Sequence, residues 1–353
     1  MKIGLLLPAN LYFCPYANIY IKILEEKKLD YEIICWDKTG TEEKVDLVYR
    51  RKIAGNNSTL KKFWAYYLYA RYLKKCIKER HYDKLIVFGP QIGIFCRSFL
   101  VKHYRKSFIL DYRDLSIEQK CKKEYSELLK NSALNVVSSL GFLKCLPNGF
   151  DYVLSHNMNE EMAKEMKNKT FDDTFLNLKK IVILTIGAIR DCEQNIELLD
   201  ALADNEKFDI QFVGKSDFSE IISNYAKEKN ISNVSFIGFY KKEEEREYVE
   251  QCTFMNIYYP RKLSHDTALS NRFYNALLYF KPMIVTKNTI QGDFVEKYHL
   301  GIAIENCDDL LYRIEEFLQT FDCKRFIKGR NELLNKFLCD QIFFRNSLIE
   351  TLE

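Results

Sequence analysis

The sequence predicts an α/β protein that contains two doubly wound domains in tandem. Short apolar runs alternate with helical patterns along the whole chain, and the candidate strands are apolar on both faces. Strands of this kind form parallel sheets that helices cover on both sides. A polar segment over residues 158–179 separates two such series. We therefore expect an N-terminal domain over residues 1–157 and a C-terminal domain over residues 158–353, with enough chain for a core in each.

The first series of strands starts near the N-terminus, where the run KIGLLL is typical of a buried strand. Helical patterns over residues 60–80 and 119–131 lie between later strands of this series. The expected strands are residues 2–7, 31–36, 84–89, 107–112, 134–139 and 151–157.

The second series starts at KIVILTIG, residues 180–187. Its most sharply bounded helix covers residues 271–280, because Ser270 supplies an N-cap oxygen and the Lys281-Pro282 pair ends the helix. The expected strands are residues 180–187, 208–214, 233–239, 254–259, 282–286 and 301–305, and the expected helices are residues 195–204, 217–229, 242–251 and 271–280.

Several classes of protein do not fit the residue pattern. The eleven cysteines are scattered without a CxxC pair, which is typical of reduced thiols in a cytosol and argues against a disulfide framework or a zinc site. No run of about eighteen apolar residues is present to span a membrane. GxGxxG and GxxxxGK[ST] are both absent, which argues against a nicotinamide dinucleotide site and a P-loop. No metal site is expected.

Positive charge is concentrated in the first half of the chain. Residues 1–157 carry 27 Lys and Arg against 16 Asp and Glu, and residues 50–106 carry 15 against 2. Such a segment suggests an acidic partner, either anionic lipid or nucleic acid. The helix over residues 60–80 adds the rings of Phe63, Trp64, Tyr67 and Tyr72 to this charge, which fits docking on a membrane surface or a core-packing helix with a solvated basic edge. No nucleic-acid-binding module is visible, so nucleic acid is not expected as a partner.

Three expected strands of the C-terminal domain run into a glycine turn. The carboxyl ends of parallel strands meet at one edge of a sheet, and ligands bind there. A glycine turn before a helix can cradle a phosphate, an arginine can clamp a diphosphate, and aromatic rings can stack on a base. The alternative is a set of ordinary turns with solvated side chains. The residues concerned are Gly187 and Arg190, Gly214 and Lys215, and Phe239 and Tyr240 after Gly238.

The order of these segments, followed by SNRFYNALLYFKPMIVT at residues 270–286, resembles the C-terminal half of family 4 glycosyltransferases with the GT-B fold. The resemblance covers residues 180–320, and residues 1–157 match more loosely through KIGLLLP, FILDYRD, LNVVSS and VLSHN. The NRFYN helix before KP is similar to that of bacterial cell-surface polysaccharide enzymes. The resemblance implies two Rossmann-like domains that face each other across a cleft, with a last helix at about 336–353 that crosses back to the N-terminal domain.

The resemblance also implies the chemistry. Family members transfer a sugar from a nucleotide diphosphate donor to an acceptor, usually with retention and without a metal or other cofactor. Arg190 stands at the diphosphate-clamping position, Lys215 replaces a lysine that relatives carry closer to it, and the N-terminus of the helix at 271–280 would meet the phosphates or the sugar. The residues implied to bind the donor are Gly187, Arg190, Gly214, Lys215, Phe239, Tyr240, His265, Asp266, Thr267, Ser270, Asn271 and Arg272.

Two positions depart from the family pattern. The family commonly carries two glutamates where this chain has Thr267 and Asn275. Asn275 can hydrogen-bond a ribose or sugar hydroxyl but carries no negative charge. Many relatives have a histidine near Arg113 and Asp114. Arg113 could contact a phosphate or an acidic acceptor and Asp114 could orient it, or the two could form a structural pair. Arg113, Asp114 and Asn275 are therefore the candidate catalytic residues.

These expectations describe a retaining, metal-independent glycosyltransferase of bacterial surface polysaccharide synthesis. Its partners would be a nucleotide-sugar donor, a saccharide or lipid-linked saccharide acceptor, and the anionic inner face of the cell membrane, which the basic segment 60–106 would contact from the cytoplasm. The missing glutamates leave open a non-catalytic subunit that binds a nucleotide-sugar or a partner enzyme. A nucleotide-sugar epimerase of the same fold is a further alternative, but it would need acid–base carboxylates that are in poor supply here.

Overall fold

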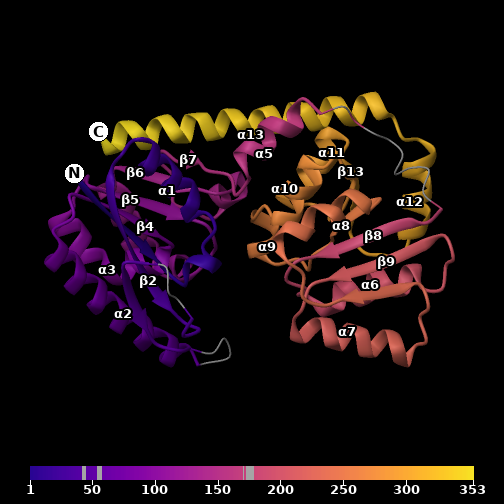
Figure 1. Cartoon of the computed structure of the whole chain (residues 1–353), viewed down its shortest axis with the longest axis horizontal. Helices are drawn as coiled ribbons and strands as arrows, with labels where there is room; N and C mark the ends of the chain where they lie inside the picture. Colours follow the sequence, from indigo (N-terminus) through magenta and orange to yellow (C-terminus); the bar gives the residue numbers. More distant parts are fainter. Residues whose placement is uncertain (42–44, 54–57, 170, 172–178) are drawn as a thin grey trace. The chain divides into compact units, whose positions relative to one another are not determined.

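The computed structural model describes residues 1–41, 45–53, 58–169, 171 and 179–353. These residues form two compact units, one of residues 1–157 with 340–353 and one of residues 158–339. Each unit contains a parallel sheet with helices on both faces (Figure 1). The predicted fold class, two Rossmann-like doubly wound domains as in the GT-B fold, is confirmed.

The first unit has a seven-stranded sheet in the order β3-β2-β1-β4-β5-β6-β7, every pair parallel. Its strands are β1 Lys2–Leu7, β2 Asp30–Asp37, β3 Leu47–Arg50, β4 Lys84–Phe88, β5 Phe108–Tyr112, β6 Leu134–Val137 and β7 Val153–Leu154. Its helices are α1 Ala17–Glu26, α2 Thr59–Arg80, α3 Pro90–His103 and α4 Lys122–Asn131, with short 3-10 helices η1 Leu11–Phe13, η2 Ile117–Gln119 and η3 Leu140–Lys144. The edge strand β3 was not predicted from the sequence.

The core of the first unit follows from the alternation of side chains along β1. Ile3, Leu5 and Leu7 point to one face of the sheet, where they pack in one cluster with buried residues of α1. Phe344 and Leu348, from the C-terminal end of the long helix α13 (Cys323–Leu352), complete the same cluster. Helices α2 and α3 lie side by side on the other face (Figure 1).

The second unit has a six-stranded parallel sheet in the order β10-β9-β8-β11-β12-β13. Its strands are β8 Ile181–Ile186, β9 Phe208–Val213, β10 Val234–Ile237, β11 Phe254–Ile257, β12 Met283–Thr286 and β13 Gly301–Ile304. Its helices are α5 Glu160–Lys167, α6 Cys192–Leu202, α7 Asp217–Glu228, α8 Glu245–Gln251, α9 Leu263–Thr267, α10 Asn271–Leu278, α11 Ile290–Tyr298 and α12 Leu310–Gln319, with the 3-10 helix η5 Lys242–Glu244. All six predicted strands of this series are confirmed within one or two residues at each end.

The strand order of the second unit fixes where a ligand can bind. From β8 the chain proceeds to β9 and β10 on one side, and it returns to β11 on the other side of β8. In open α/β sheets, a crevice forms outside the carboxyl ends of the strands at such a reversal. Helices α6, α7 and α12 contribute to the core on one face, while α8, α10 and α11 contact strands from the other. The turns after β8 and β11 therefore mark the candidate site.

Helix α10 is held at both ends. The Ser270 hydroxyl accepts a hydrogen bond from the Phe273 N–H at 3.3 Å and caps the N-terminus. At the other end, the buried Arg330 of α13 donates to the carbonyl oxygens of Leu277 (2.9 Å) and Leu278 (3.0 Å). The last carbonyls of a helix have no partner within the helix, so Arg330 supplies the donors that they need. None of the described helices is long and apolar enough to cross a membrane.

Candidate functional site

The turn between β8 and α6 lies at the reversal point of the second sheet. Gly187 opens it with a φ of +96°, and Asp191 closes it as the N-cap residue of α6 with a φ of +57°. The backbone N–H groups of residues 188–190 donate to no acceptor in the part of the chain that the structure describes. Consecutive N–H groups in such a turn form an anion-binding concavity at the start of a helix.

Arg272 of α10 holds the start of this turn. Its buried guanidinium donates to the carbonyl oxygens of Ile186 (2.6 Å, from Nε) and Ala188 (3.2 Å, from Nη2). The same group lies over the ring of Tyr259, with Cζ 5.6 Å from the centroid. The sequence predicted that Arg272 would meet an anion directly, but the structure gives it a different role. Because its donors face backbone carbonyls, it positions the turn.

Two further side chains donate hydrogen bonds to backbone carbonyl oxygens in the rest of the turn. The Ser216 hydroxyl donates to the carbonyl oxygen of Ile189 at 2.6 Å. Nδ2 of Asn195 donates to the carbonyl oxygens of Arg190 (2.7 Å) and Asp191 (3.1 Å). These carbonyls are thus turned toward the protein, which leaves the intervening N–H groups for a ligand. Neither Ser216 nor Asn195 was predicted to belong to the site.

The glycines after β8 and β9 let two strand ends approach closely. Gly214 has a φ of +139°, and a Cβ placed on it would lie 2.0 Å from the carbonyl oxygen of Gly187. A Cβ on Gly187 would lie 3.9 Å from the hydroxyl of Tyr240, which follows β10. The structure therefore brings Gly187, Gly214 and Tyr240 together, as expected for residues at one edge of the sheet.

Positive charge and an aromatic ring are exposed at the same edge. Arg190 follows β8 and Lys215 follows β9, and both side chains are exposed. Neither cation has a hydrogen-bond or ion-pair partner among the described residues. Phe239, which follows β10 after Gly238, is 81% exposed. Unpaired cations beside a flat apolar ring suit a ligand that carries phosphate on an aromatic base.

The predicted residues on α9 are largely engaged with protein groups. Nε2 of His265 lies 3.8 Å from a carboxylate oxygen of Asp191, at the end of the β8–α6 turn. Asp266 accepts from both Nε (2.9 Å) and Nη2 (3.2 Å) of Arg261. Thr267 is buried, and its hydroxyl donates to a carbonyl of its own helix at 2.6 Å. His265 thus borders the turn, while Asp266 and Thr267 stabilise the loop after β11.

At the start of α10, some predicted side chains likewise bond to protein groups and another is exposed. The Ser270 hydroxyl, which caps the helix, also donates to Oε1 of Gln291 at 2.8 Å. Asn271 is exposed at the first helical position. One turn later, Nδ2 of Asn275 donates to Oε1 of Glu245 at 2.9 Å, and the Tyr240 hydroxyl donates to Oε2 of the same carboxylate at 3.0 Å. Glu245 lies in a run of charged residues and was not among the site residues predicted from the sequence.

In the first unit, Arg113 lies directly after β5 and is buried. It donates to both carboxylate oxygens of Asp111, at 2.5 Å from Nε and 2.6 Å from Nη2, and to the carbonyl oxygen of Ser155 at 2.8 Å. Burial alone would lower the pKa of Arg113, but the Asp111 carboxylate raises it above its ordinary value. The pairing is therefore with Asp111 rather than with Asp114, which is exposed. A contact of Arg113 with a ligand phosphate is not supported by these hydrogen bonds, because they engage its donors within the protein.

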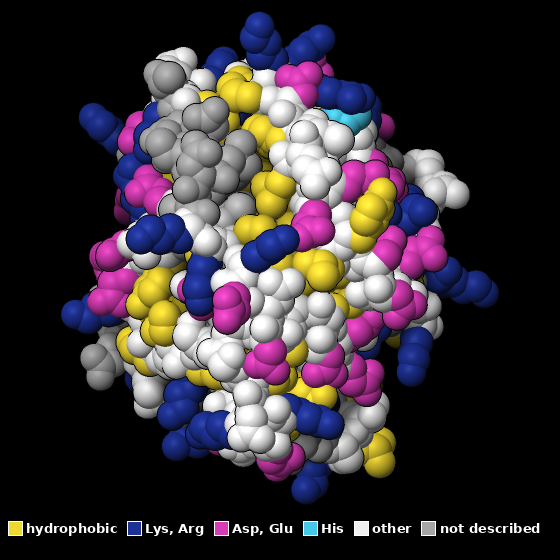
Figure 2. Space-filling model, turned by 90° about the vertical axis from the view of Figure 1, so that its right-hand side faces the viewer, with side chains coloured by type: hydrophobic (Ala, Val, Ile, Leu, Met, Phe, Trp, Pro, Cys, Tyr) yellow, Lys and Arg dark blue, Asp and Glu magenta, His cyan; other side chains and the backbone are white. Residues whose placement is uncertain are grey.

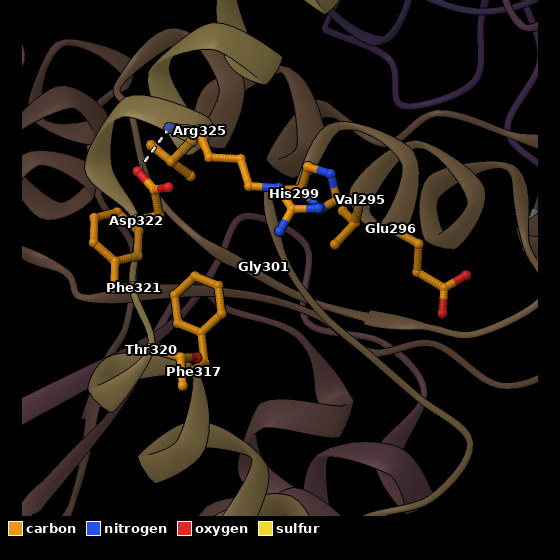
Figure 3. A pocket seen from close by; sticks show the side chains of 10 residues that line it. Val295, Glu296, His299, Gly301, Phe317, Thr320, Phe321, Asp322 and Arg325 are labelled. Carbon is orange, nitrogen blue, oxygen red and sulfur yellow. Dashed lines mark hydrogen bonds between the residues drawn. The ribbon is translucent and has the colours of Figure 1, made fainter.

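A cavity of the second unit lies away from these turns. It has a volume of about 350 Å³ and opens at the amino end of β13, beside Gly301. Figure 3 shows the side chains of Arg325, His299 and Phe317 around it, while Glu296 extends to one side. Acidic and basic side chains are interspersed on the face of the molecule shown in Figure 2. This cavity shares no residue with the turns described above, since it lies at the opposite edge of the sheet.

Comparisons with known proteins identify the fold but no family. No protein-family profile matches the sequence, and no curated protein matches it. Among solved structures, sucrose-phosphate synthase from Thermosynechococcus elongatus is 13% identical, with a TM-score of 0.70 over 100% of this chain and 99% of that one. A glycosyltransferase from Rickettsia africae is 14% identical, with a TM-score of 0.66 over 99% and 97%. HepE from Anabaena, solved in complex with UDP, is 13% identical, with a TM-score of 0.63 over 100% and 99%. The chain therefore has the fold of GT-B glycosyltransferases.

Proposed function

We propose that the chain is a glycosyltransferase that moves a sugar from a nucleotide diphosphate-sugar to a saccharide acceptor. The observation that carries the proposal is the β8–α6 turn, whose N–H groups at residues 188–190 lack protein acceptors among the described residues while Arg190 stands beside them unpaired. Such a turn suits a diphosphate. The fold it shares with sucrose-phosphate synthase and with HepE in complex with UDP supports the same interpretation.

In this proposal the chain's own groups supply the electrostatics of the reaction. The turn and Arg190 hold the diphosphate, Lys215 adds charge, and Phe239 stacks on the base. The departing diphosphate gains negative charge as the glycosidic bond breaks, so donors already aimed at it lower the barrier. These cations take the place of a metal ion, and we propose a metal-independent reaction with retention at the anomeric carbon.

Binding to nucleoside diphosphates tests the proposal. The wild-type protein is titrated with UDP, GDP, ADP and TDP, each with and without an attached sugar, by calorimetry. We expect Arg190→Ala to weaken the best ligand by about tenfold or more, since a charge-assisted hydrogen bond contributes about 1.5–3 kcal/mol. Arg325→Ala removes an arginine at the opposite edge of the sheet and should leave binding unchanged. Absence of binding across the panel would refute the proposal.

A non-catalytic binding subunit is the second candidate, and two observations favour it. Asn275 carries no charge, and the Thr267 hydroxyl is bonded within its own helix, so neither position offers a carboxylate to the donor. A transfer assay with a saccharide acceptor separates the candidates. An enzyme forms product that Arg190→Ala abolishes, and proton NMR of the product identifies the anomer. A binding subunit retains affinity without turnover, and the double variant Asn275→Glu, Glu245→Gln would then show whether a carboxylate at position 275 restores turnover.

We further propose that the acceptor is a lipid-linked saccharide in bacterial surface polysaccharide synthesis, and that the chain reaches it on the inner face of the cell membrane. The first turns of α2 expose Leu60 (74%), Phe63 (53%) and Trp64 (57%). Lys61 and Lys62 are exposed among them. Apolar rings next to lysines match the headgroup region of an anionic membrane, where each basic residue contributes about 1 kcal/mol.

Vesicle sedimentation tests the membrane proposal. The wild type should sediment with vesicles of phosphatidylglycerol and phosphatidylcholine but less with phosphatidylcholine alone. The double variant Lys61→Glu, Lys62→Glu should lose most of this binding. The matched variant Lys179→Glu, Lys180→Glu changes two adjacent exposed lysines of the second unit and should behave as wild type. Equal sedimentation of both variants would refute the assignment to α2.

A further inference from the structure

Three elements of the second unit bring a hydroxyl, a carboxylate and an amide together beside the β8–α6 turn. Tyr240 follows β10, Glu245 is the first residue of α8, and Asn275 lies in α10. The Glu245 carboxylate is only 14% exposed and accepts from Tyr240 at 3.0 Å and from Asn275 at 2.9 Å. Lys242 forms an ion pair with it. The Tyr240 hydroxyl is the atom nearest to a Cβ placed on Gly187, at 3.9 Å.

The chemistry of the carboxylate fixes how the Asn275 amide is turned. An ionised carboxylate only accepts hydrogen bonds, so the Asn275 atom that faces Glu245 must be the amide nitrogen. Its carbonyl oxygen Oδ1 therefore points away from Glu245. Among the described residues Oδ1 has no donor, and it is not a buried unpartnered atom, since Glu118 Oε2 alone has that status there. Oδ1 is thus an accessible acceptor in a fixed direction.

We propose that Glu245 and Tyr240 are positioning residues that hold Asn275 so that Oδ1 accepts a hydrogen bond from a hydroxyl group of the donor, either of its ribose or of its transferred sugar. This inference rests on the proposed function of the β8–α6 turn. The Glu245 charge also polarises the amide, which makes Oδ1 a stronger acceptor than an asparagine in water. The site thereby obtains part of the effect of a carboxylate from an uncharged side chain.

The inference predicts a specific pattern among four variants. Asn275→Ala removes the acceptor and should weaken nucleotide-sugar binding about fivefold to tenfold, the effect of one hydrogen bond. Glu245→Ala should produce a similar loss, because the amide is no longer held. The double variant should lose no more than Asn275→Ala, since both changes act on the same hydrogen bond. Glu243→Ala removes an exposed carboxylate two residues earlier, which has no partner among the described residues, and should bind as wild type.

Exchange of the two groups provides a rescue test. Asn275→Asp places two carboxylates against each other and should weaken binding, because like charges this close repel. When Glu245→Gln is added, the amide and the carboxylate have exchanged places. An N–H···O contact between the two side chains is then available again, and the second carboxylate oxygen at position 275 can still accept from the donor. We expect this double variant to recover most of the wild-type affinity. A residue that served stability alone would show recovery of the unfolding midpoint without recovery of affinity.

The experiment is calorimetry with UDP and UDP-glucose, and with the corresponding pair of any other nucleotide that the wild type binds better. If Asn275→Ala weakens the binding of both ligands, the hydroxyl belongs to the ribose. If it weakens the binding of UDP-glucose alone, the hydroxyl belongs to the sugar. Glu245→Ala with wild-type affinity, or losses that add in the double variant, would overturn the inference but leave the proposed function intact. A wild type that binds no nucleotide would overturn both.

Discussion

Three glycines follow three neighbouring strands of the second unit, and their replacement by alanine separates backbone strain from steric overlap. Gly187 and Gly214 have φ values of +96° and +139°, whereas Gly238 lies outside the left-handed region. A Cβ would meet a backbone oxygen at 2.0 Å from Gly214, only a hydroxyl at 3.9 Å from Gly187, and nothing within 4 Å from Gly238. The three sites thus carry strain with overlap, strain alone, and neither.

The expected losses of unfolding free energy follow from these differences. Gly238→Ala should change it by less than about 0.5 kcal/mol, as most surface substitutions do. Gly187→Ala adds only the strain of a left-handed residue, about 1–2 kcal/mol. Gly214→Ala adds similar strain and forces the Gly187 carbonyl to move, which costs a further 1–3 kcal/mol or about 2–5 kcal/mol in total.

Urea denaturation followed by circular dichroism measures the three losses. Tryptophan fluorescence serves as an internal control, because Trp36 and Trp64 both lie in the first unit. Gly214→Ala should also weaken nucleotide binding, since the displaced carbonyl belongs to the β8–α6 turn. Equal urea midpoints for Gly214→Ala and Gly238→Ala would refute the assignment of a close approach between the two strand ends.

Two further predictions concern buried ionisable groups of the first unit. Asp111→Asn should lower the free energy of unfolding by about 3–5 kcal/mol, because it leaves the Arg113 charge buried without its counter-ion. In the same urea titration, Asp114→Asn at an exposed position should lower it by less than about 0.5 kcal/mol. Equal effects of the two variants would contradict the ion pair. Burial raises the pKa of Tyr20 and of Tyr69 well above 10.0, so the stability that these neutral phenols contribute is present below about pH 10 and is lost at higher pH. Absorbance at 295 nm and circular dichroism should therefore change together in an alkaline titration, and smooth ionisation of every tyrosine near pH 10 without loss of structure would contradict it.

Most of the fold could be predicted because buried strands are visible in the sequence as runs of apolar residues. A parallel strand covered on both faces needs consecutive apolar residues, and β8, β12 and β13 of the second unit have them. The strand that was missed, β3, covers Leu47–Arg50 at the edge of its sheet and has no fully buried residue. An edge strand can pair through its backbone alone, so its side chains carry little signal.

The glycines of the site were predictable because the backbone itself imposes the residue at those positions. Gly187 and Gly214 stand at strand ends where the chain needs a left-handed conformation, and that requirement is visible in the sequence. Arg272 and Arg113 were identified as important, but the direction of an arginine depends on elements far away in the chain. Both guanidinium groups turn out to bind protein oxygens. Glu245 was missed because a buried carboxylate and a solvated one look alike within a run of charges.

One sequence signal could have located the site more directly. Asn256 is an amide inside the buried strand β11, and its Nδ2 donates to Thr185 at 2.8 Å and to Asn195 at 3.3 Å. Asn195 in turn holds the carbonyls at the end of the β8–α6 turn. An apolar residue at 256 would bury at lower desolvation cost, so stability alone does not account for an amide there. The hydrogen-bonded side chains of Asn256 and Asn195 thus connect the sheet to the β8–α6 turn and fix the shape of that turn. Because the N–H groups of a fixed turn are already oriented, a diphosphate can bind without the cost of ordering them first.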